Sequence, residues 1–451
     1  MKKSSTIFAC SNCSAQYPKW QGRCVECGKW NTIEEEGRVA EAAVSVAKAE
    51  ALPVQTLGAV GTGASKRLSS GIPEFDMVLG GGFVPGSIVL LGGDPGIGKS
   101  TLSLQVACHM KSENYSVLYV SAEESEGQVK LRATRLAGNN EEVLVVNSGN
   151  LERILATVQK LRPQCVVLDS VQTVSSEALP SAAGSAPQVR FVAEQFLKVA
   201  KSLNVVTILI GHVTKEGIVA GPKTLEHLVD VVLYLEGDRY GSFRVLRGTK
   251  NRFGATGEVG VFEMTTKGLM EVADPSRVFL EERHPKDAGT AVFVTLEGKR
   301  AFLGLVQALV TRTNFGYPKR AASGFDLNRL QLLVAVLTKK AGLELDDQDI
   351  YLKTVGGLKL DDPALDLPVC LAIASSFHNK PVDPALVAMG EVGLAGEIRS
   401  ALHTRERLKE IQKMGFKKIV LAPKSELRNV KSALQLVEAE SISRAIQQSL
   451  S

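Results

Sequence analysis

The segment Gly-Asp-Pro-Gly-Ile-Gly-Lys-Ser at residues 93–100 constrains the fold of this chain more than any other feature. It follows the apolar run at residues 87–93 and precedes a helix-forming stretch, which is the setting of a phosphate-binding loop. Its glycines let backbone N–H groups approach phosphate oxygens, and the helix N-terminus adds a favourable dipole. The alternative is a glycine-rich turn without a ligand. We favour the phosphate-binding loop because both its flanks fit.

Each residue of this loop has an expected role. Lys99 is expected to reach the β and γ phosphates of ATP, and Ser100 is expected to bind Mg²⁺. The residues expected to bind ATP or ADP are Gly93, Asp94, Pro95, Gly96, Ile97, Gly98, Lys99, Ser100 and Thr101.

Apolar strand-like runs alternate with helical stretches along the middle of the chain. This alternation predicts an α/β domain with a parallel sheet that is covered on both faces. After residue 230 the pattern predicts antiparallel strands instead. The parallel runs are residues 87–93, 116–122, 143–147, 164–170 and 205–212, and the antiparallel runs are residues 231–237, 243–254 and 258–265.

Polar residues follow three of these parallel runs, so we expect them at one sheet edge, where α/β sheets bind ligands. Asp169 is expected to hold Mg²⁺ through water, although it could be a buried capping residue. Glu123, which we favour over Glu124, is expected to orient or deprotonate the attacking water, although either could simply complement a helix dipole. His212 could report the nucleotide state, or it could be an ordinary strand-end residue.

Four cysteines near the N-terminus form two pairs of the Cys-x2-Cys type. Two such pairs predict one tetrahedral zinc site, whereas a redox pair is expected singly and beside a βαβ unit. Four thiolates leave no open position, so the zinc is expected to be structural. The expected ligands are Cys10, Cys13, Cys24 and Cys27. The module either only folds around zinc or also contacts nucleic acid or a partner through Lys19, Trp20, Arg23 and Lys29.

Length and composition indicate several domains. A chain of 451 residues exceeds what one core usually organises. Residues 34–65 contain no aromatic residue and read as a linker. We therefore expect a zinc module at residues 1–33, an ATPase domain at residues 66–273 and an α+β domain at residues 274–451.

Charge and hydropathy exclude some classes and leave others open. The balance of 53 Lys plus Arg against 48 Asp plus Glu permits a polyanionic partner without requiring one. The chain has no apolar run of the ~20 residues that would span a bilayer, and its first apolar run is too short for a signal peptide. We expect a cytoplasmic protein without a membrane partner.

The run Lys-Asn-Arg-Phe-Gly at residues 250–254 adds a discriminating feature. With the four-cysteine module and the phosphate-binding loop, it resembles the bacterial DNA repair and recombination family RadA, also called Sms, of the RecA and DnaB-helicase group. The resemblance covers essentially the whole chain. It implies a RecA-like ATPase core and a C-terminal domain similar to that of Lon protease.

The same resemblance implies a function. Members of this family are expected to be DNA-dependent ATPases that move along single strands, act on branched recombination intermediates and drive branch migration alongside a RecA-type recombinase. DnaB-like members form rings, so a hexamer is expected. In such a ring Lys250 and Arg252 would reach the nucleotide of the neighbouring subunit, unless they belong to a basic hairpin that touches DNA.

Two segments are expected to contact single-stranded DNA along the ring axis, unless they are ordinary connectors. They are residues 172–190 and 213–225, with Arg190, Lys215 and Lys223 as their charges. They contain few cations and lack aromatic residues that would stack bases, so the expected contact is with the DNA backbone.

Proteolysis is not expected of the C-terminal domain. Residues 361–369 contain no serine where the Lon nucleophile belongs, and the position of its lysine is taken by Arg405, which cannot deprotonate. The Lon-like run at residues 356–359 precedes that position and is a decoy. We expect a scaffold with Lys339, Lys340, Lys353 and Lys359 as candidate DNA contacts. An active protease and a non-motor switch that only assembles on DNA are the rival readings.

Overall fold

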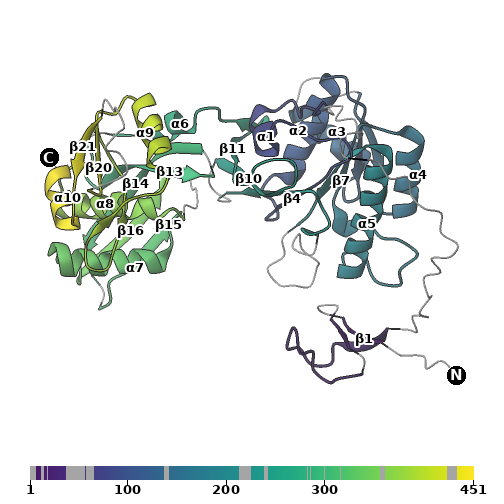
Figure 1. Ribbon diagram of the computed structural model, residues 1–451, viewed down its shortest axis with the longest axis horizontal. Helices are drawn as coiled ribbons and strands as arrows, with labels where there is room; N and C mark the ends of the chain where they lie inside the picture. Colours follow the sequence, from purple (N-terminus) through teal and green to yellow (C-terminus); the bar gives the residue numbers. More distant parts are fainter. Residues whose placement is uncertain are drawn as a thin grey trace. The chain divides into compact units, whose positions relative to one another are not determined.

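The structure is a computed structural model of the chain (Figure 1). It describes residues 7–11, 15–17, 19–36, 56, 66–136, 142–212, 225–237, 242–281, 283–284, 286–298, 300–314, 316–355, 361–423 and 434–450. The chain divides into two compact units, residues 1–64 and residues 65–451.

The first unit is a small three-stranded antiparallel sheet. Its order is β2-β1-β3, formed by β1 (Ile7–Cys10), β2 (Gln16–Tyr17) and β3 (Ile33–Glu36). Its core is very small, and the buried members are Cys10, Cys24 and Ile33. Strand β3 continues to Glu36, three residues past the end of the zinc module expected from composition. A core of this size needs another source of stability, such as a metal.

The second unit contains a nine-stranded sheet of order β12-β11-β10-β9-β4-β8-β7-β5-β6. Six neighbouring strands are parallel, which confirms the predicted α/β sheet. The strands are β4 (Ile88–Gly93), β5 (Val117–Ser121), β6 (Leu144–Asn147), β7 (Cys165–Asp169), β8 (Val206–Ile210), β9 (Val231–Glu236), β10 (Phe243–Asn251), β11 (Val259–Thr265) and β12 (Gly268–Glu271).

The change to antiparallel pairing comes one strand later than the sequence predicts. Strand β9 was expected to open the antiparallel part, but it runs parallel to β4 and antiparallel only to β10. The chain leaves β8 on one side of β4 and returns as β9 on the other side. Strand β9 therefore extends the parallel part of the sheet, and the antiparallel hairpins begin with its pairing to β10.

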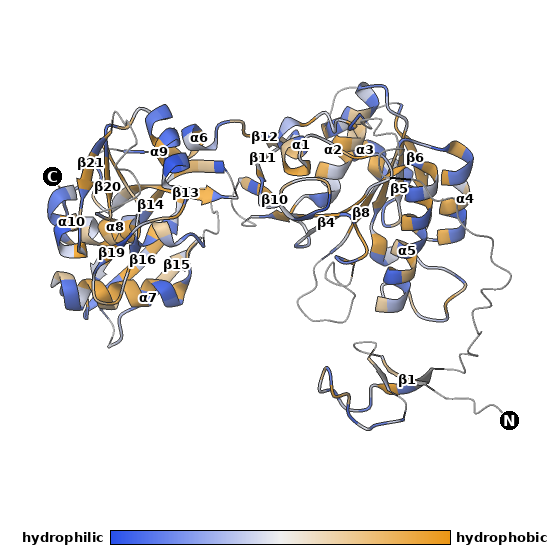
Figure 2. Ribbon diagram, viewed as in Figure 1, coloured by the Kyte–Doolittle hydropathy of each residue, from blue (hydrophilic) through white to orange (hydrophobic). Residues whose placement is uncertain are grey.

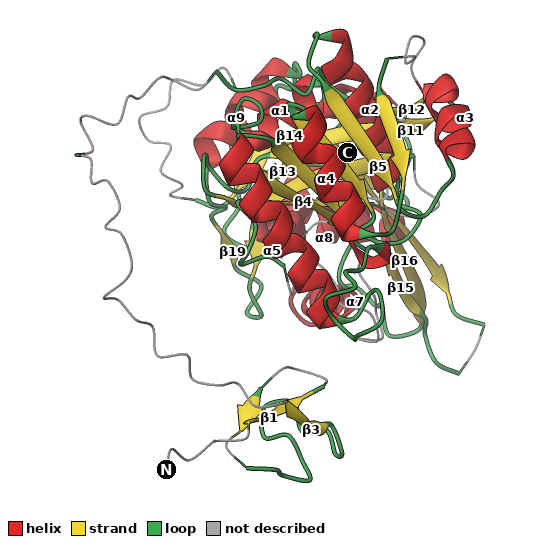
Figure 3. Cartoon of the chain, turned by 90° about the vertical axis from the view of Figure 1, so that its right-hand side faces the viewer, coloured by secondary structure: helices red, strands yellow, loops and turns green. Residues whose placement is uncertain are grey.

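Helices cover both faces of this sheet (Figure 3). Alternate residues of the parallel strands enter two separate cores, as side chains of a strand must. One core includes residues of α1 (Pro73–Leu79), α2 (Lys99–Ser112) and α3 (Glu126–Leu136). The other includes residues of α4 (Leu151–Leu161) and α5 (Ala186–Leu203). The strands between them are strongly hydrophobic (Figure 2), as buried parallel strands are.

The C-terminal part of this unit has a mixed seven-stranded sheet of order β15-β16-β14-β13-β17-β20-β21. Helix α8 packs on its central strands β13 and β14. The strands are β13 (Thr290–Glu297), β14 (Arg300–Arg312), β15 (Arg320–Ser323), β16 (Gln348–Thr354), β17 (Leu386–Ala388), β20 (Lys418–Leu421) and β21 (Gln435–Glu438), and a separate hairpin joins β18 (Glu391–Val392) to β19 (Ile398–Arg399). The helices are α6 (Pro275–Glu281), α7 (Leu327–Val336), α8 (Asp366–His378), α9 (Thr404–Lys413) and α10 (Ile442–Ser449).

Among the residues that the structure describes, no helix combines the length and the apolar character that crossing a membrane requires.

Candidate active site

The loop after β4 has backbone geometry that only glycine accepts at two positions. Gly93 has φ +148°, and a Cβ there would lie 2.5 Å from the carbonyl oxygen of Leu235 on β9. Gly98 has φ +115°, and a Cβ there would lie 2.8 Å from Met264 Cε on β11. The loop is therefore pressed against neighbouring strands, with its free side open: a Cβ at Gly96 would meet nothing within 4 Å. This open backbone is suited to phosphate oxygens.

Lys99 begins helix α2 and is almost completely buried, with 2% of its surface exposed. Its ammonium group donates hydrogen bonds of 2.9 Å to the carbonyl oxygens of Gly93 and Asp94, so it lies across the inside of the loop. Burial lowers the pKa of Lys99 to about 8, while the carboxylates of Asp169, Asp94 and Glu123 act in the opposite direction. Ser100 and Thr101 follow in the first turn of the helix.

Asp169 ends β7 and is buried beside this lysine. Its Oδ2 accepts a hydrogen bond of 2.6 Å from the hydroxyl of Tyr119 and lies 3.8 Å from the guanidinium of Arg132. Its Oδ1 is buried and has no hydrogen-bond partner among the described residues. A buried oxygen without a partner is costly unless a ligand satisfies it, so the site fits a hydrated metal ion.

Glu123 and Glu124 follow β5 but have different partners. Glu123 Oε1 accepts a short hydrogen bond from Ser170 and lies 3.5 Å from His212 Nε2. Glu124 instead forms an ion pair of 2.7 Å with Arg132. Hydrogen bonding to His212 is the main reason that the pKa of Glu123 is lowered to about 2. Glu123 therefore faces the edge with Asp169 and His212, while Glu124 is turned toward helix α3.

Three side chains at this edge were missed by sequence reasoning: Tyr119, Arg132 and Ser170. Tyr119 is buried, and burial followed by the charge of Asp169 raises its pKa well above the ordinary value. One signal was available, because a tyrosine inside an apolar strand usually needs a partner for its hydroxyl. No signal in the sequence identified Arg132, which lies on helix α3.

Lys250 and Arg252 lie far from the loop of their own chain. Lys250 on β10 pairs with Val232 on β9, which pairs with Leu90 on β4. It therefore lies two strands from β4 and level with Leu90, three residues or roughly 10 Å before Gly93 along the strand. Its ammonium group donates 2.6 Å to the carbonyl oxygen of Glu226. The lysine and the arginine thus do not join Lys99 and Asp169 within one chain.

The strand expected at residues 243–254 ends earlier than predicted, so Lys250 lies in β10 and Arg252 does not. Strand β10 has an irregularity between Gly248 and Lys250 and ends at Asn251. Arg252 follows the strand, and its guanidinium lies 3.3 Å from Asp230, with its side chain 55% exposed. The arginine is thus partly exposed to solvent while it pairs with the buried carboxylate of Asp230.

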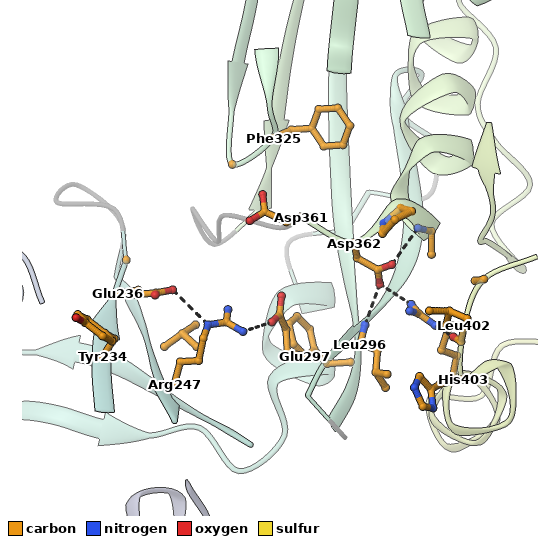
Figure 4. A pocket seen from close by; sticks show the side chains of 18 of the residues that line it. Tyr234, Glu236, Arg247, Leu296, Glu297, Phe325, Asp361, Asp362, Leu402 and His403 are labelled. Carbon is orange, nitrogen blue, oxygen red and sulfur yellow. Dashed lines mark hydrogen bonds and ion pairs between the residues drawn. The ribbon is translucent and has the colours of Figure 1, made fainter. Parts of the chain in front are cut away.

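A cavity of about 1030 Å³ lies next to the loop and reaches the C-terminal part of the same unit (Figure 4). Gly93, Asp94 and Ile97 line one end of it. Arg247 crosses it from β10, with ion pairs of 3.5 Å to Glu236 and 2.5 Å to Glu297. The arginine therefore connects a carboxylate beside the nucleotide loop with one on β13.

Comparison with known proteins identifies the family. A protein of Bacillus subtilis strain 168 named "DNA repair protein RadA" is 47% identical over 427 residues, which are 93% of each chain. The chain belongs to the RadA family of DNA repair proteins. A RadA of Listeria monocytogenes is 45% identical over 99% of each chain, and one of Streptococcus pyogenes is 47% identical over 95% of each chain. The resemblance seen in the sequence is thus confirmed.

Three family models match parts of this RadA-family chain. Residues 60–217 match an AAA domain, residues 8–35 match a rubredoxin metal binding domain, and residues 330–425 match subunit ChlI of Mg-chelatase. A crystal structure of a KaiC-like protein from Pyrococcus horikoshii is 23% identical, with a TM-score of 0.39, and covers 46% of this chain and 99% of its own. The family and its AAA domain make this chain an ATP hydrolase.

The first unit gathers three of the four predicted zinc ligands. The sulfur atoms of Cys10, Cys24 and Cys27 all lie within 4.8 Å of one another. Cys13 lies outside the described residues. Thiolates that converge in this way fit a tetrahedral zinc ion.

The C-terminal part of the second unit contains a buried arginine, Arg407, that the sequence analysis did not single out. Arg405, which takes the position of the Lon lysine, is exposed. Arg407 is 3% exposed, and it forms an ion pair of 2.7 Å with Asp362 and donates a hydrogen bond of 2.9 Å to the carbonyl oxygen of Val294. Helix α9 begins at Thr404, and its phase turns Arg407 inward. The Lon-like run at residues 356–359, with Lys359, lies outside the described residues.

Proposed function

We propose that this RadA-family ATPase is DNA-dependent and processes recombination intermediates, and that it stimulates branch migration in RecA-mediated strand exchange. The meeting of Lys99, Asp169 and Glu123 at one sheet edge supports ATP hydrolysis there, and the names of the relatives support DNA repair. A RecA-type recombinase and single-stranded or branched DNA are the proposed partners.

Residues 93–101 would hold the nucleotide. The backbone of the loop would cradle the phosphates, and Lys99 would turn from the carbonyl oxygens of Gly93 and Asp94 to the β and γ phosphates. Ser100 and Asp169 would hold Mg²⁺, with the unpartnered Oδ1 of Asp169 accepting from its hydration shell. When bound, Mg²⁺ would neutralise charge on the phosphates.

Glu123 would position the attacking water. Because its pKa is about 2, it is ionised at any working pH but is a weak proton acceptor. We therefore assign it the orientation of water by hydrogen bonding rather than early deprotonation. Ser170 and His212 hold its carboxylate, so His212 could pass a change at the nucleotide to the segment that follows it.

Lys250 and Arg252 would complete the site of a neighbouring subunit. Their position two strands from β4 and well before its carboxyl end keeps them away from their own loop, and the arginine is more than half exposed. A ring of six subunits would bring them to the next nucleotide, where their charge would stabilise the transferring phosphate.

DNA would pass along the ring axis. Of the two expected segments, residues 172–190 are described, and Arg190 is exposed at the start of α5, where it pairs with Glu194. Most of the second segment, including Lys215 and Lys223, lies outside the described residues. Contacts from a few cations to phosphates would be independent of sequence and sensitive to salt.

The C-terminal domain would act as a scaffold without proteolysis. The segment 361–369 contains no serine, and its Asp362 forms an ion pair with Arg407. Lys339, Lys340 and Lys353 are exposed and could contact duplex DNA. A similar non-catalytic role is proposed for zinc, held by Cys10, Cys13, Cys24 and Cys27.

The decisive experiment measures ATP hydrolysis and branch migration of the purified protein with and without a RecA-type recombinase. Single-stranded DNA should raise the ATPase rate, and branched substrates should be converted faster with recombinase present. Lys99→Ala should abolish both activities. An ATPase rate that DNA does not change would refute the proposal. ATP-stimulated cleavage of casein would instead support an active protease.

A further inference from the structure

Both tryptophans of the chain lie on the surface of the first unit. The 451 residues contain two Trp, and their side chains are 59% exposed at Trp20 and 69% exposed at Trp30. Each ring has an atom 3.8 Å from the point where a Cβ on Gly22 would lie, so both rings border the same spot. Two large apolar rings exposed on so small a unit indicate a contact surface. We call Trp20 and Trp30 the indole patch.

The indole N–H group of Trp20 holds the ring in place through a hydrogen bond within the unit. Its Nε1 donates a hydrogen bond of 3.0 Å to the carbonyl oxygen of Ile33 on β3. The N–H group is therefore already used within the unit, so a partner of this exposed side chain would contact the apolar surface of the ring. This favours stacking over hydrogen bonding.

Trp30 lies on a short hairpin that is closed by backbone hydrogen bonds. Trp30 pairs across this hairpin with Arg23, and the backbone bonds Asn31 N to Gly22 O and Cys24 N to Lys29 O, both 2.9 Å, close it on either side. The guanidinium of Arg23 lies 5.8 Å from the centre of the Trp30 ring, and its Nε donates 2.9 Å to the carbonyl oxygen of Gly28. The indole and the cation are thus presented together.

Basic residues adjoin both rings. Each tryptophan follows a lysine, in the dipeptides Lys19-Trp20 and Lys29-Trp30, and both lysines and Arg23 are exposed. Proteins bind single-stranded nucleic acids with aromatic rings that stack on the bases and neighbouring cations that contact the phosphates. A peptide partner would need acidic residues to pair with these cations. It could not accept a hydrogen bond from the N–H group of Trp20, which is already bonded to Ile33.

We propose that the indole patch is a second single-stranded DNA site, where unpaired bases stack on Trp20 and Trp30 while Lys19, Arg23 and Lys29 contact the phosphates. It differs in chemistry from the axial segments, which lack aromatic residues and contact only the backbone. Duplex DNA, whose bases are already stacked, would bind the patch poorly. The site is independent of ATP hydrolysis.

Tryptophan fluorescence of the full-length, zinc-loaded protein tests this directly, because every tryptophan signal comes from the patch. The probes are a short oligodeoxythymidine and an abasic strand of equal length, which has the phosphates without the bases. The oligodeoxythymidine should quench the fluorescence and the abasic strand should not. Trp30→Ala should weaken binding at least about five-fold and Trp30→Phe much less, since stacking on phenylalanine remains possible.

Val25→Ala is the matched control, because Val25 is 74% exposed in the same hairpin but carries no ring. It should leave quenching and affinity unchanged, and zinc content should be equal in all variants. Binding of the strand, detected by anisotropy, without quenching would overturn the indole patch but leave the proposed function intact. Equal quenching by the abasic strand, or quenching by a recombinase and not by DNA, would also overturn it. Failure to bind any single strand would overturn both proposals.

Discussion

The carboxylate of Glu123 lies 3.5 Å from Nε2 of His212, although the two residues follow different strands. Strands β5 and β8 lie on either side of β7 in the sheet, so residues just beyond their carboxyl ends meet above the end of β7. The contact brings together a carboxylate that could orient water and a side chain that leads into the next loop. It also distinguishes Glu123 from its neighbour Glu124.

Replacement of Glu123 should separate ATP binding from hydrolysis. Glu123→Gln removes the charge but preserves the shape, so we expect the ATPase rate to fall about 100-fold or more, with ATP affinity changed little. Glu124→Gln is the matched control, because Glu124 forms an ion pair with Arg132 and not with His212, and it should retain activity within a few-fold. Steady-state rates and nucleotide titrations measure both effects. The opposite ranking of the two variants would assign the role to Glu124.

Nucleotide binding should weaken as the pH rises through about 8. Burial lowers the pKa of Lys99 to about 8, so above that pH the free protein loses the cation that meets the phosphates. The effect on folding has the opposite sign: between pH 8 and 10.5 the unfolded chain binds the proton and the folded chain does not, so this group favours folding more as the pH rises. The pH profile of kcat/KM for ATP measures the functional effect. A profile that stays flat to pH 9 would contradict the assigned environment of Lys99.

The placement of site residues at one sheet edge could be predicted, because parallel strands end together wherever they lie in the sheet. Asp169, Glu123 and His212 were found by this rule without knowledge of the strand order. Their partners could not be found, since the bond from Tyr119 to Asp169 requires that β5 and β7 be neighbours. The parallel direction of β9 was missed for the same reason, because the sequence does not show that β9 pairs with β4.

The burial of Arg407 could not be predicted from the sequence either, and it leads to a prediction about stability. Alignment with Lon selects Arg405, but the phase of helix α9 buries Arg407, which forms an ion pair with Asp362. Arg407→Ala should destabilise this part of the protein by about 3 kcal/mol, because the largely buried carboxylate of Asp362 loses the cation paired with it. Arg405→Ala, two residues away and exposed, should change stability by less than about 0.5 kcal/mol. Urea denaturation of the two variants measures this, and equal stability would contradict the burial of Arg407.

Loss of zinc should unfold the first unit and spare the ATPase core. The core of this unit is built from Cys10, Cys24 and Ile33, which is too little to fold without the metal. Cys24→Ser should release the zinc and expose the unit to proteolysis. Residues 65–451 form a separate compact unit, so the basal ATPase rate should stay within about two-fold of the wild type. Metal analysis and limited proteolysis follow the first effect, and a lost basal rate would show that the two units depend on each other.

Mixing two inactive variants should restore ATP hydrolysis if Arg252 acts on the neighbouring subunit. Lys99→Ala disables the loop of its own subunit, and Arg252→Ala disables the contribution to the next one. In a mixed ring, some interfaces pair an intact loop with an intact arginine. With equal amounts and random assembly, these are about one quarter of all interfaces, so about one quarter of wild-type activity should return.

The controls for this experiment follow from the contacts of Arg252. A protein that carries both substitutions in one chain should be inactive, because none of its interfaces has an intact loop or an intact arginine. Lys201→Ala removes the other cation that pairs with Asp230, at 2.8 Å, and should keep its ATPase activity, which separates catalysis from support of that buried aspartate. If the mixture stays inactive although mixed rings form, Arg252 acts within its own subunit or only holds Asp230. An active Arg252→Ala protein would remove the arginine from the site altogether.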